Sequence, residues 1–212
     1  MNLIPRFYDV TDGKITIDGK DIRNVSQHEL REKLGYVPQK AVLFSGDIAS
    51  NILYGNPDGS EAEMTEAATI AQATEFIEQK KKKYKSTISQ GGSNVSGGQK
   101  QRLSIARAIA KHPDIYIFDD SFSALDYKTD ATLRAKLKEK TSESTVMIVA
   151  QRISTILHAD QIIVLDDGQI VGKGTHKELL KNCEAYYQIA SSQLSEKELE
   201  EDLKEVESYA KR

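Results

Sequence analysis

The stretch NVSGGQKQRLSIARAIA, residues 94–110, predicts a helix whose first turn is rich in glycine. We expect Ser96 at the position just before the helix, with Gly97 and Gly98 in its first turn. Glycines there let backbone N–H groups approach a ligand closely, and a helix N-terminus carries about half a positive charge. The stretch therefore indicates either a phosphate-binding helix start or an ordinary capped helix after a glycine-rich loop.

A second informative stretch follows a short distance downstream. The apolar run IYIFDD, residues 115–120, predicts a buried parallel strand that ends in Asp119 and Asp120. A carboxylate at the C-terminal end of a parallel strand lies where open α/β sheets bind ligands, and it is a common way to hold Mg²⁺ beside a nucleotide. Asp119 is thus a candidate metal ligand and Asp120 a candidate for orienting water. The alternative is a strand that simply enters a polar loop.

The rest of the chain alternates between strand and helix patterns. Apolar residues recur at three- and four-residue spacing between about residues 48 and 112, which favours helices. Thr175 and Glu178 have the spacing of a capping box at a helix start. Strands are predicted at residues 14–18, 35–37 and 146–150, the last one fully buried, and a hairpin is predicted at 161–173 with its turn at 166–168. This order predicts an α/β core with a helical lobe.

Composition excludes several classes of protein. The 212 residues, 39% of them hydrophobic, are enough to bury a sizeable core. A net charge of −3 gives no electrostatic reason to expect a nucleic-acid partner. The single cysteine, Cys183, excludes an internal disulfide framework. Apolar runs fall far short of the roughly 20 residues that span a bilayer, so we expect no transmembrane segment in this chain.

Together, these motifs resemble the nucleotide-binding domain of an ATP-binding cassette (ABC) transporter. VSGGQ (95–99) is similar to the family's signature motif, IYIFDD to its Walker B strand and SALD (123–126) to its D-loop. YVPQ, which ends in Gln39, resembles the Q-loop, and VAQR places Gln151 at the switch-histidine position. LIPRFYDVTDGKITIDGKDI and LFSGDIASNILYG are similar to the exporter, multidrug-type branch. The five motifs occur in the family's order, and the resemblance extends to about residue 192.

The resemblance implies an α/β fold of the P-loop NTPase type, with a mostly parallel sheet and a helical subdomain at about residues 46–112. Residues 1–192 would form the C-terminal portion of the nucleotide-binding domain, and residues 193–212 a charged helix or tail. The first residues match the family just downstream of the P-loop. We therefore expect the N-terminal part of the domain to be absent from these 212 residues.

The resemblance also implies roles for individual residues. In this family ATP lies between the P-loop and Walker B strand of one domain and the signature helix of a partner. Asp119 would hold Mg²⁺ through water, and Gln39 would sense the metal and contact the transmembrane part. Asp120, Gln151 and Gln39 occupy the catalytic positions. The residues expected to bind ATP or line the partner interface are Ser96, Gly97, Gly98, Gln99, Ser123 and Asp126. The implied partners are a second nucleotide-binding domain and an exporter's transmembrane domain, at the cytoplasmic face of the membrane.

The largest departure from the family is the missing P-loop motif. No G-x-x-x-x-G-K-[S/T] occurs, because the Gly-Lys pairs at 13–14, 19–20 and 172–173 are followed by Ile, Asp and Gly. We expect that the chain alone does not turn over ATP. The P-loop strand lies inside the family's core sheet, so its absence would leave two unpaired strand edges. Exposed edges favour aggregation, and we expect the isolated chain to be poorly soluble or partly folded.

Two further departures affect the catalytic positions. Asp120 stands where active members usually carry Glu, which draws the carboxylate back by roughly 1.5 Å, the length of a C–C bond. Gln151 replaces the switch histidine, and an amide can donate a hydrogen bond but cannot carry a proton charge. Both changes resemble the degenerate half of heterodimeric exporters, which mainly holds ATP. Gln90 also replaces a glutamate that many exporters have in the loop facing the transmembrane domain.

Two alternatives remain open beside the exporter interpretation. One is a non-enzymatic interaction module, or a truncated fragment, that donates its signature helix to ATP held by a partner. The other is the C-terminal lobe of a chromosome-maintenance or repair ATPase. Such proteins carry long heptad arms, which this sequence does not show, and LFSGDIASNILYG also argues against that class.

Overall fold

The computed structural model describes residues 1–200 and 202 of the chain. It divides into two compact units, Met1–Val149 and Ala150–Arg212, which are described separately below. Among the described residues, no helix combines the length and the apolar character that crossing a bilayer requires.

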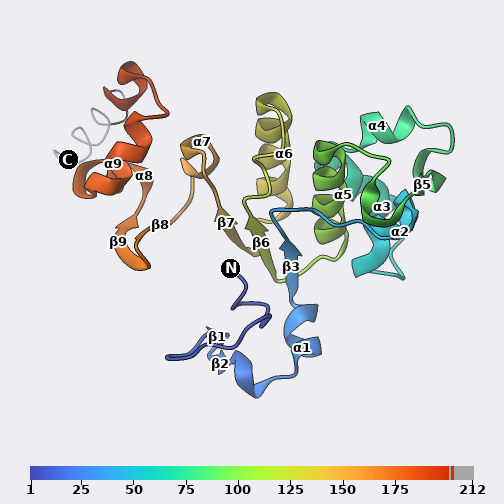
Figure 1. The fold of residues 1–212 in the computed structure, drawn as a ribbon, viewed down its shortest axis with the longest axis horizontal. Helices are drawn as coiled ribbons and strands as arrows, with labels where there is room; N and C mark the ends of the chain where they lie inside the picture. Colours follow the sequence, from blue (N-terminus) through green and yellow to red (C-terminus); the bar gives the residue numbers. More distant parts are fainter. Residues whose placement is uncertain (201, 203–212) are drawn as a thin grey trace. The chain divides into compact units, whose positions relative to one another are not determined.

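The first unit is built on a parallel sheet of three strands, β3 (Leu34–Val37), β6 (Ile115–Asp119) and β7 (Thr145–Val149) (Figure 1). The strand order is β3-β6-β7, with β6 at the centre. In the register of these strands, Tyr36 lies opposite Ile117. The strands alternate with helices along the chain, so the predicted α/β class with a parallel sheet is confirmed.

The two faces of this sheet contribute to different hydrophobic clusters, because side chains alternate between faces along a strand. Val37, Tyr116 and Phe118 lie on one face and belong to the main core, which also contains residues of helices α5 (Gly97–Ala110) and α6 (Tyr127–Lys140). The opposite face forms a smaller cluster in which the N-terminal segment packs against the sheet; its members include Met1, Ile4, Leu34, Tyr36, Ile115 and Ile117.

Strand β7 differs from its predicted state. The sequence predicts a fully buried strand, but Met147 and Val149 are 37% and 38% exposed. Val146 and Ile148, on the other face, pack against the main core. The reason is that Met147 and Val149 share the face of Ile117, and the N-terminal cluster that covers this face does not extend to them.

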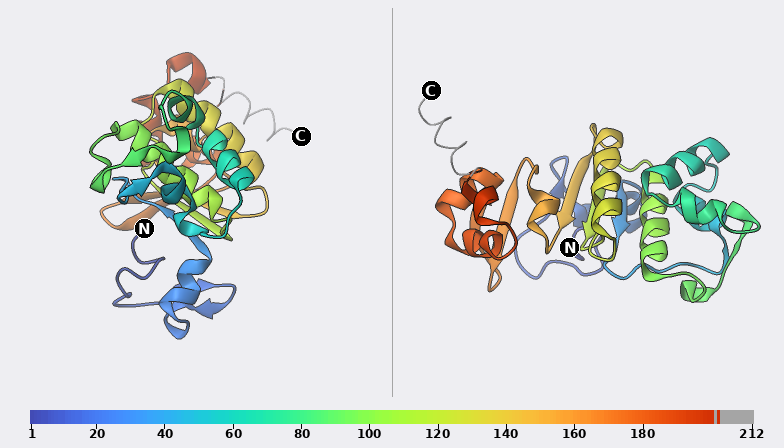
Figure 2. Two further views of the ribbon diagram at one scale, coloured as in Figure 1. Left: turned by 90° about the vertical axis from the view of Figure 1, so that its right-hand side faces the viewer. Right: turned by 90° about the horizontal axis from the view of Figure 1, so that it is seen from above.

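A helical lobe occupies one end of the first unit, on the right-hand side of the right view in Figure 2. It contains α2 (Ile48–Ile52), α3 (Glu61–Ile70), α4 (Thr74–Glu78) and α5, with short 3₁₀ turns at Leu53–Gly55, Lys83–Lys85 and Gln90–Gly92. Strands β4 (Gly46–Asp47) and β5 (Thr87–Ile88) pair in antiparallel fashion. The helical pattern of residues 61–79 is interrupted at Gln72, whose φ of 56° lies in the left-handed region.

The N-terminal part is less regular than predicted. Residues 1–7 form hydrogen-bonded turns, such as Phe7 N–H to the carbonyl of Asn2, where the apolar pattern predicts the end of a helix. The predicted strand at 14–18 shortens to β1 (Thr16–Ile17), which pairs with β2 (Lys20–Asp21). A 3₁₀ turn (Ile22–Asn24) and helix α1 (Gln27–Glu32) lead from β2 to β3.

The second unit contains the predicted hairpin and capped helix. Strands β8 (Ile162–Asp166) and β9 (Gln169–Gly174) are joined by Asp167 and Gly168, both with positive φ, as a tight hairpin turn requires. Helix α7 (Ile153–Ile156) precedes them. Thr175 and Glu178 form the predicted capping box at the start of α8 (His176–Asn182), and α9 (Glu184–Ser191) follows. Of the predicted charged C-terminal segment, residues 196–200 are helical, and 201 and 203–212 lie outside the described residues.

Candidate nucleotide site

Three of the predicted site residues meet at the carboxyl ends of β3 and β6. Gln39 lies two residues beyond β3, Asp119 ends β6 and Asp120 follows it. The side-chain Nε2 of Gln39 donates a hydrogen bond of 3.0 Å to Oδ2 of Asp120. Parallel pairing of the two strands places their ends at the same edge of the sheet, where open α/β sheets bind ligands.

The backbone at Asp120 turns sharply out of the strand. Its φ is 47°, in the left-handed region that Asp enters more readily than most residues. Its N–H donates to the carbonyl of Val149 at 3.0 Å, and its own carbonyl accepts from the hydroxyl of Ser123 at 2.9 Å. Asp120 is only 8% exposed. The loop therefore holds the carboxylate in a restricted position.

Two buried polar residues that no sequence motif indicates fix the Q-loop next to these carboxylates. Ser121, completely buried, donates from Oγ to the carbonyl of Val37 at 2.8 Å. Gln101, on helix α5, donates from Nε2 to the carbonyl of Pro38 at 3.2 Å. Both contacts connect residues more than 60 positions apart, so no local pattern could have revealed them.

A third residue, Tyr36, begins the YVPQ motif, which predicted no role for it, and it contacts Asp119. Its hydroxyl lies 3.2 Å from Oδ2 of Asp119 and 3.2 Å from the side-chain oxygen of Asn2. Burial, together with the negative charge of Asp119, raises the pKa of the Tyr36 phenol. The hydroxyl therefore keeps its hydrogen at neutral pH and is a donor toward the carboxylate.

The signature stretch begins a helix, as predicted. Ser96 is the N-cap of α5, and its Oγ accepts from the N–H of Gln99 while Oε1 of Gln99 accepts from the N–H of Ser96, which is a complete capping box. A side chain added at Gly97 would meet no atom within 4 Å, and one at Gly98 would lie 3.4 Å from the carbonyl of Ala124. The ordinary capping role is thus present, and the backbone at Gly97 is open to a ligand.

The predicted D-loop residues hold the chain between β6 and α6. Ser123 hydrogen bonds to the carbonyl of Asp120, as above, and Asp126 caps α6 by accepting from the N–H of Thr129 at 3.0 Å. This hydrogen bonding to Thr129 lowers the pKa of the Asp126 carboxyl. Gly98 and Ala124 bring this loop next to the start of the signature helix.

Gln151 belongs to the second unit, where its backbone carbonyl accepts a hydrogen bond of 2.9 Å from Nε2 of Gln193. Its participation in one site with Gln39 and Asp120 therefore stays a prediction.

The donor atoms at Gln39, Asp119 and Asp120 fit a hard divalent cation. Gln39 uses its amide nitrogen toward Asp120, so its carbonyl oxygen is the atom left for a cation, and Mg²⁺ prefers oxygen ligands. Within residues 1–200 and 202, no cluster of three or more His, Cys, Asp or Glu side chains is arranged to bind a metal. Mg²⁺ commonly takes one or two carboxylates and fills its remaining positions with water and substrate phosphates.

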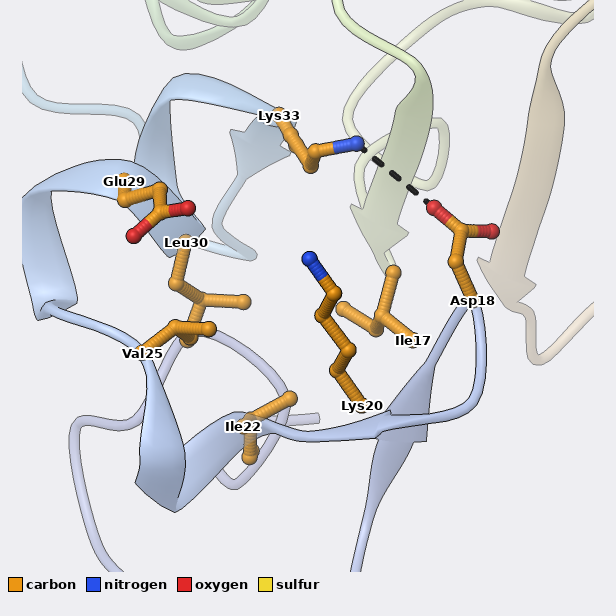
Figure 3. Close-up of a pocket in the computed structure, with 8 residues that line it drawn as sticks. All are labelled: Ile17, Asp18, Lys20, Ile22, Val25, Glu29, Leu30 and Lys33. Atoms are coloured by element: carbon orange, nitrogen blue, oxygen red, sulfur yellow. Dashed lines mark ion pairs between the residues drawn. The ribbon is translucent and has the colours of Figure 1, made fainter.

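A separate hollow of about 90 Å³ lies between β1, β2 and α1 (Figure 3). Its apolar lining includes Ile22 and Leu30, and at its rim Lys33 forms an ion pair of 3.5 Å with Asp18. It contains none of the predicted site residues.

Comparison with known proteins supports the same assignment as the motifs. The chain is 47% identical over 196 residues to an uncharacterized ABC transporter ATP-binding protein of Mycobacterium tuberculosis, covering 91% of this chain and 33% of that protein. It is 44% identical over 193 residues to a Staphylococcus aureus protein provisionally named as a multidrug export ATP-binding/permease protein, with the same coverage. A solved structure of a bacterial Atm1-family ABC exporter with ATP bound aligns with a TM-score of 0.88 and 40% identity, covering 92% of this chain and 34% of that one.

The chain thus spans about a third of the length of the relatives it matches. The family model described as "ABC transporter" matches residues 1–123, more than half of the chain. The matched residues include the Q-loop, the signature helix and both carboxylates of the site. The chain therefore belongs to the ABC transporter family.

Proposed function

We propose that this chain is part of the ATP-binding and ATPase domain of an ABC exporter, which couples ATP binding and hydrolysis to export of a substrate across a membrane. The observation that carries the proposal is the hydrogen bond between Gln39 and Asp120 beside Asp119 at the carboxyl ends of the strands. It joins the Q-loop to Asp120, the carboxylate that follows Asp119 at the end of the Walker B strand, and so supports a site for Mg²⁺ and ATP there.

Each residue at this edge has a separate task in the proposal. Asp119 holds Mg²⁺ through water, and the bound cation neutralises charge on the ATP phosphates. Asp120 orients the attacking water, and Gln39 restrains the Asp120 carboxylate by the observed hydrogen bond. Because Asp120 is one methylene shorter than the usual Glu, we propose that this site holds ATP and hydrolyses it slowly, as in the degenerate half of a heterodimer.

The signature helix serves a second nucleotide-binding domain. Ser96, Gly97 and Gly98 form the start of a long helix, where backbone N–H groups and the helix dipole favour an anion. The open space at Gly97 allows a phosphate to approach the backbone closely. We propose that these residues, with Gln99, Ser123 and Asp126, bind the γ-phosphate of ATP held by that partner.

The phosphate cradle for this chain's own ATP has to come from residues other than these 212. Three observations support this. No P-loop motif occurs in the sequence, and β7 presents exposed apolar side chains, Met147 and Val149, along an edge to which a further strand could pair. The second unit has exposed apolar strand residues of its own, Ile163 and Leu165 on β8. We propose that the chain is inactive alone and that a P-loop strand completes its sheet.

The contact with a transmembrane domain involves an exposed aromatic surface on the helical lobe. Phe44 and Tyr54 are 42% and 60% exposed and stack at 4.4 Å, and the Arg107 guanidinium lies 5.1 Å from the Phe44 ring. The loop containing Gln90, expected to face the transmembrane domain, lies against the same region through a hydrogen bond from Gly91 to Leu43. The surface would face an exporter's transmembrane part at the cytoplasmic side of the membrane.

The experiment that tests the proposal is nucleotide-dependent association. The chain is mixed with a partner, an ABC nucleotide-binding domain that has an intact P-loop and whose catalytic Glu is replaced by Gln. Light scattering measures the molar mass of the particles in the mixture with and without Mg-ATP. We expect a heterodimer only with ATP. A mixture that stays dissociated when the partner is saturated with ATP would refute signature donation.

A further inference from the structure

The pairing register of β3 and β6 brings the side chain of Tyr36 close to Asp119, the proposed metal ligand. Tyr36 on β3 lies opposite Ile117 on β6, and Asp119 is two residues further along β6. Since residues i and i+2 of a strand lie on the same face, Tyr36 and Asp119 share a face of the sheet. The Tyr36 hydroxyl accordingly reaches Oδ2 of Asp119 at 3.2 Å.

The N-terminal segment holds the Tyr36 ring in this position. Phe7 meets the ring edge to face, with centroids 5.5 Å apart. Arg31, in turn, lies 5.3 Å from the Phe7 ring and donates to the backbone carbonyls of Pro5 and Arg6. The aromatic ring is thus fixed by a segment that is itself tied to helix α1, and the hydroxyl has little freedom to leave the carboxylate.

The hydrogen bonds of the Tyr36 hydroxyl have a definite direction. The hydroxyl lies 3.2 Å from both Asp119 Oδ2 and the Asn2 amide, but it carries one hydrogen. A carboxylate only accepts, so the hydrogen goes to Asp119. The Asn2 atom that faces the hydroxyl in the structure is Oδ1, which also only accepts. With the amide turned over, which exchanges its oxygen and nitrogen, Nδ2 would donate to the phenol oxygen, and the three residues would form a chain of donors that ends on the carboxylate.

We propose that Tyr36 is a positioning residue for Asp119 and that Asn2 fixes the direction of its hydroxyl. A hydrogen bond to one carboxylate oxygen restricts rotation of the group, so Asp119 meets the hydrated cation in one orientation. This inference rests on the proposed function, because it concerns the same Mg²⁺-ATP site. Partners of metal ligands of this kind typically change metal affinity by about 10–100-fold when they are removed.

The test compares Tyr36→Phe and Asn2→Asp with Tyr116→Phe as a matched control. Tyr116 is the neighbouring buried tyrosine, on the other face of the sheet. Affinity for Mn²⁺ together with ATP is measured by electron paramagnetic resonance on the complete transporter. We expect Tyr36→Phe to weaken Mn²⁺ binding by about 10-fold or more. Asn2→Asp should weaken it in the same direction, since a carboxylate at position 2 accepts the phenol hydrogen instead. Tyr116→Phe should have no effect.

A second readout does not depend on metal or activity. The carboxyl ¹³C resonance of Asp119, recorded without metal or nucleotide, should move in Tyr36→Phe and Asn2→Asp and stay in place in Tyr116→Phe. A resonance that does not move in Tyr36→Phe, or Mn²⁺ affinity within twofold of the wild type, would overturn the positioning role. Failure of the wild type to bind Mn²⁺-ATP would instead refute the proposed function, and the resonance would still decide whether Tyr36 orients Asp119.

Discussion

The side-chain amide of Gln39 donates a 3.0 Å hydrogen bond to the Asp120 carboxylate, 81 residues further along the chain. The contact joins the loop after β3 to the loop after β6. In the site that we propose, Asp120 stands where active ABC ATPases usually carry Glu, which is one methylene longer. The consequences of that shortening are measurable.

Lengthening this side chain should increase hydrolysis. In the complete transporter, with the partner's own ATP site inactivated, we expect Asp120→Glu to raise the rate by up to about a hundredfold, because a misplacement of about 1 Å can cost that much. Steady-state ATPase assays measure the effect. Asp120→Asn is the control, since it keeps the length and removes the charge. A Glu variant no faster than the Asn variant would show that position 120 does not limit the reaction.

Ser96 caps helix α5, and we propose that it also faces the phosphate of a partner's ATP. Two substitutions separate these two roles. Ser96→Ala removes the cap and should cost about 1 kcal/mol of unfolding free energy. Ser96→Asp keeps a good cap but places a negative charge at the anion site. We expect it to retain stability and to abolish ATP-dependent association with a partner domain, measured by light scattering.

The control for Ser96 is Thr175→Asp, in the equivalent capping box of α8. This variant should keep both stability and association. If Ser96→Asp associates with ATP as well as the wild type does, Ser96 is a helix cap without a role in phosphate binding.

The exposed side of β7 should control the solubility of the 212-residue chain. Replacing Met147 and Val149 together by Lys places charges on the exposed face of an edge strand, which disfavours edge-to-edge pairing. We expect slower aggregation, followed by turbidity at constant concentration. Ile148→Lys is the matched control, because Ile148 packs against the core, and it should destabilise the unit by about 2 kcal/mol or more.

In a longer polypeptide that includes the P-loop strand, that strand would occupy the edge of β7 that does not pair with β6, so the Met147 and Val149 double Lys variant should no longer slow aggregation. An equal effect in both contexts would contradict the proposed completion of the sheet.

Acid should weaken the capped helices. Hydrogen bonding from the backbone N–H and hydroxyl of Thr175 lowers the pKa of Glu178, and Ser60 does the same for Glu63. A carboxyl group whose pKa is lower in the folded state than in the unfolded state stabilises the fold. This contribution is fully present when the pH is above the unfolded pKa, about 4.3 for Glu. It is lost as the pH falls through the folded pKa. We expect unfolding free energy, measured with urea, to decline from about pH 5 downward.

Glu178→Gln should flatten that decline, because glutamine can close the same capping box without titrating. Glu63→Gln should behave in the same way. A decline with the wild-type slope in both variants would show that other groups cause the acid sensitivity.

Local sequence patterns predicted the elements whose structure depends on neighbours in the sequence. The helix start at Ser96, the capping box at Thr175, the hairpin turn at Asp167–Gly168 and the buried strand β6 are of this kind. Residues that depend on distant parts of the chain were missed. Ser121 and Tyr36 act through contacts across more than 80 positions, which only the parallel pairing of β3 and β6 creates.

The burial of β7 shows the same limit. Its apolar run is typical of a strand covered on both sides, but coverage depends on which strands and helices lie beside it. The observed exposure of Met147 and Val149 could not be obtained from the composition of the strand itself.

A thermal melt of the purified chain, with and without saturating Mg-ATP, tests whether these 212 residues form one part of a composite ATP site and lack the part that binds the phosphates. A competent site at about a hundred times its Kd would add about 2.7 kcal/mol and raise the midpoint clearly. We predict no shift for the chain alone. A clear shift would mean that ATP binds without a P-loop and would contradict the account.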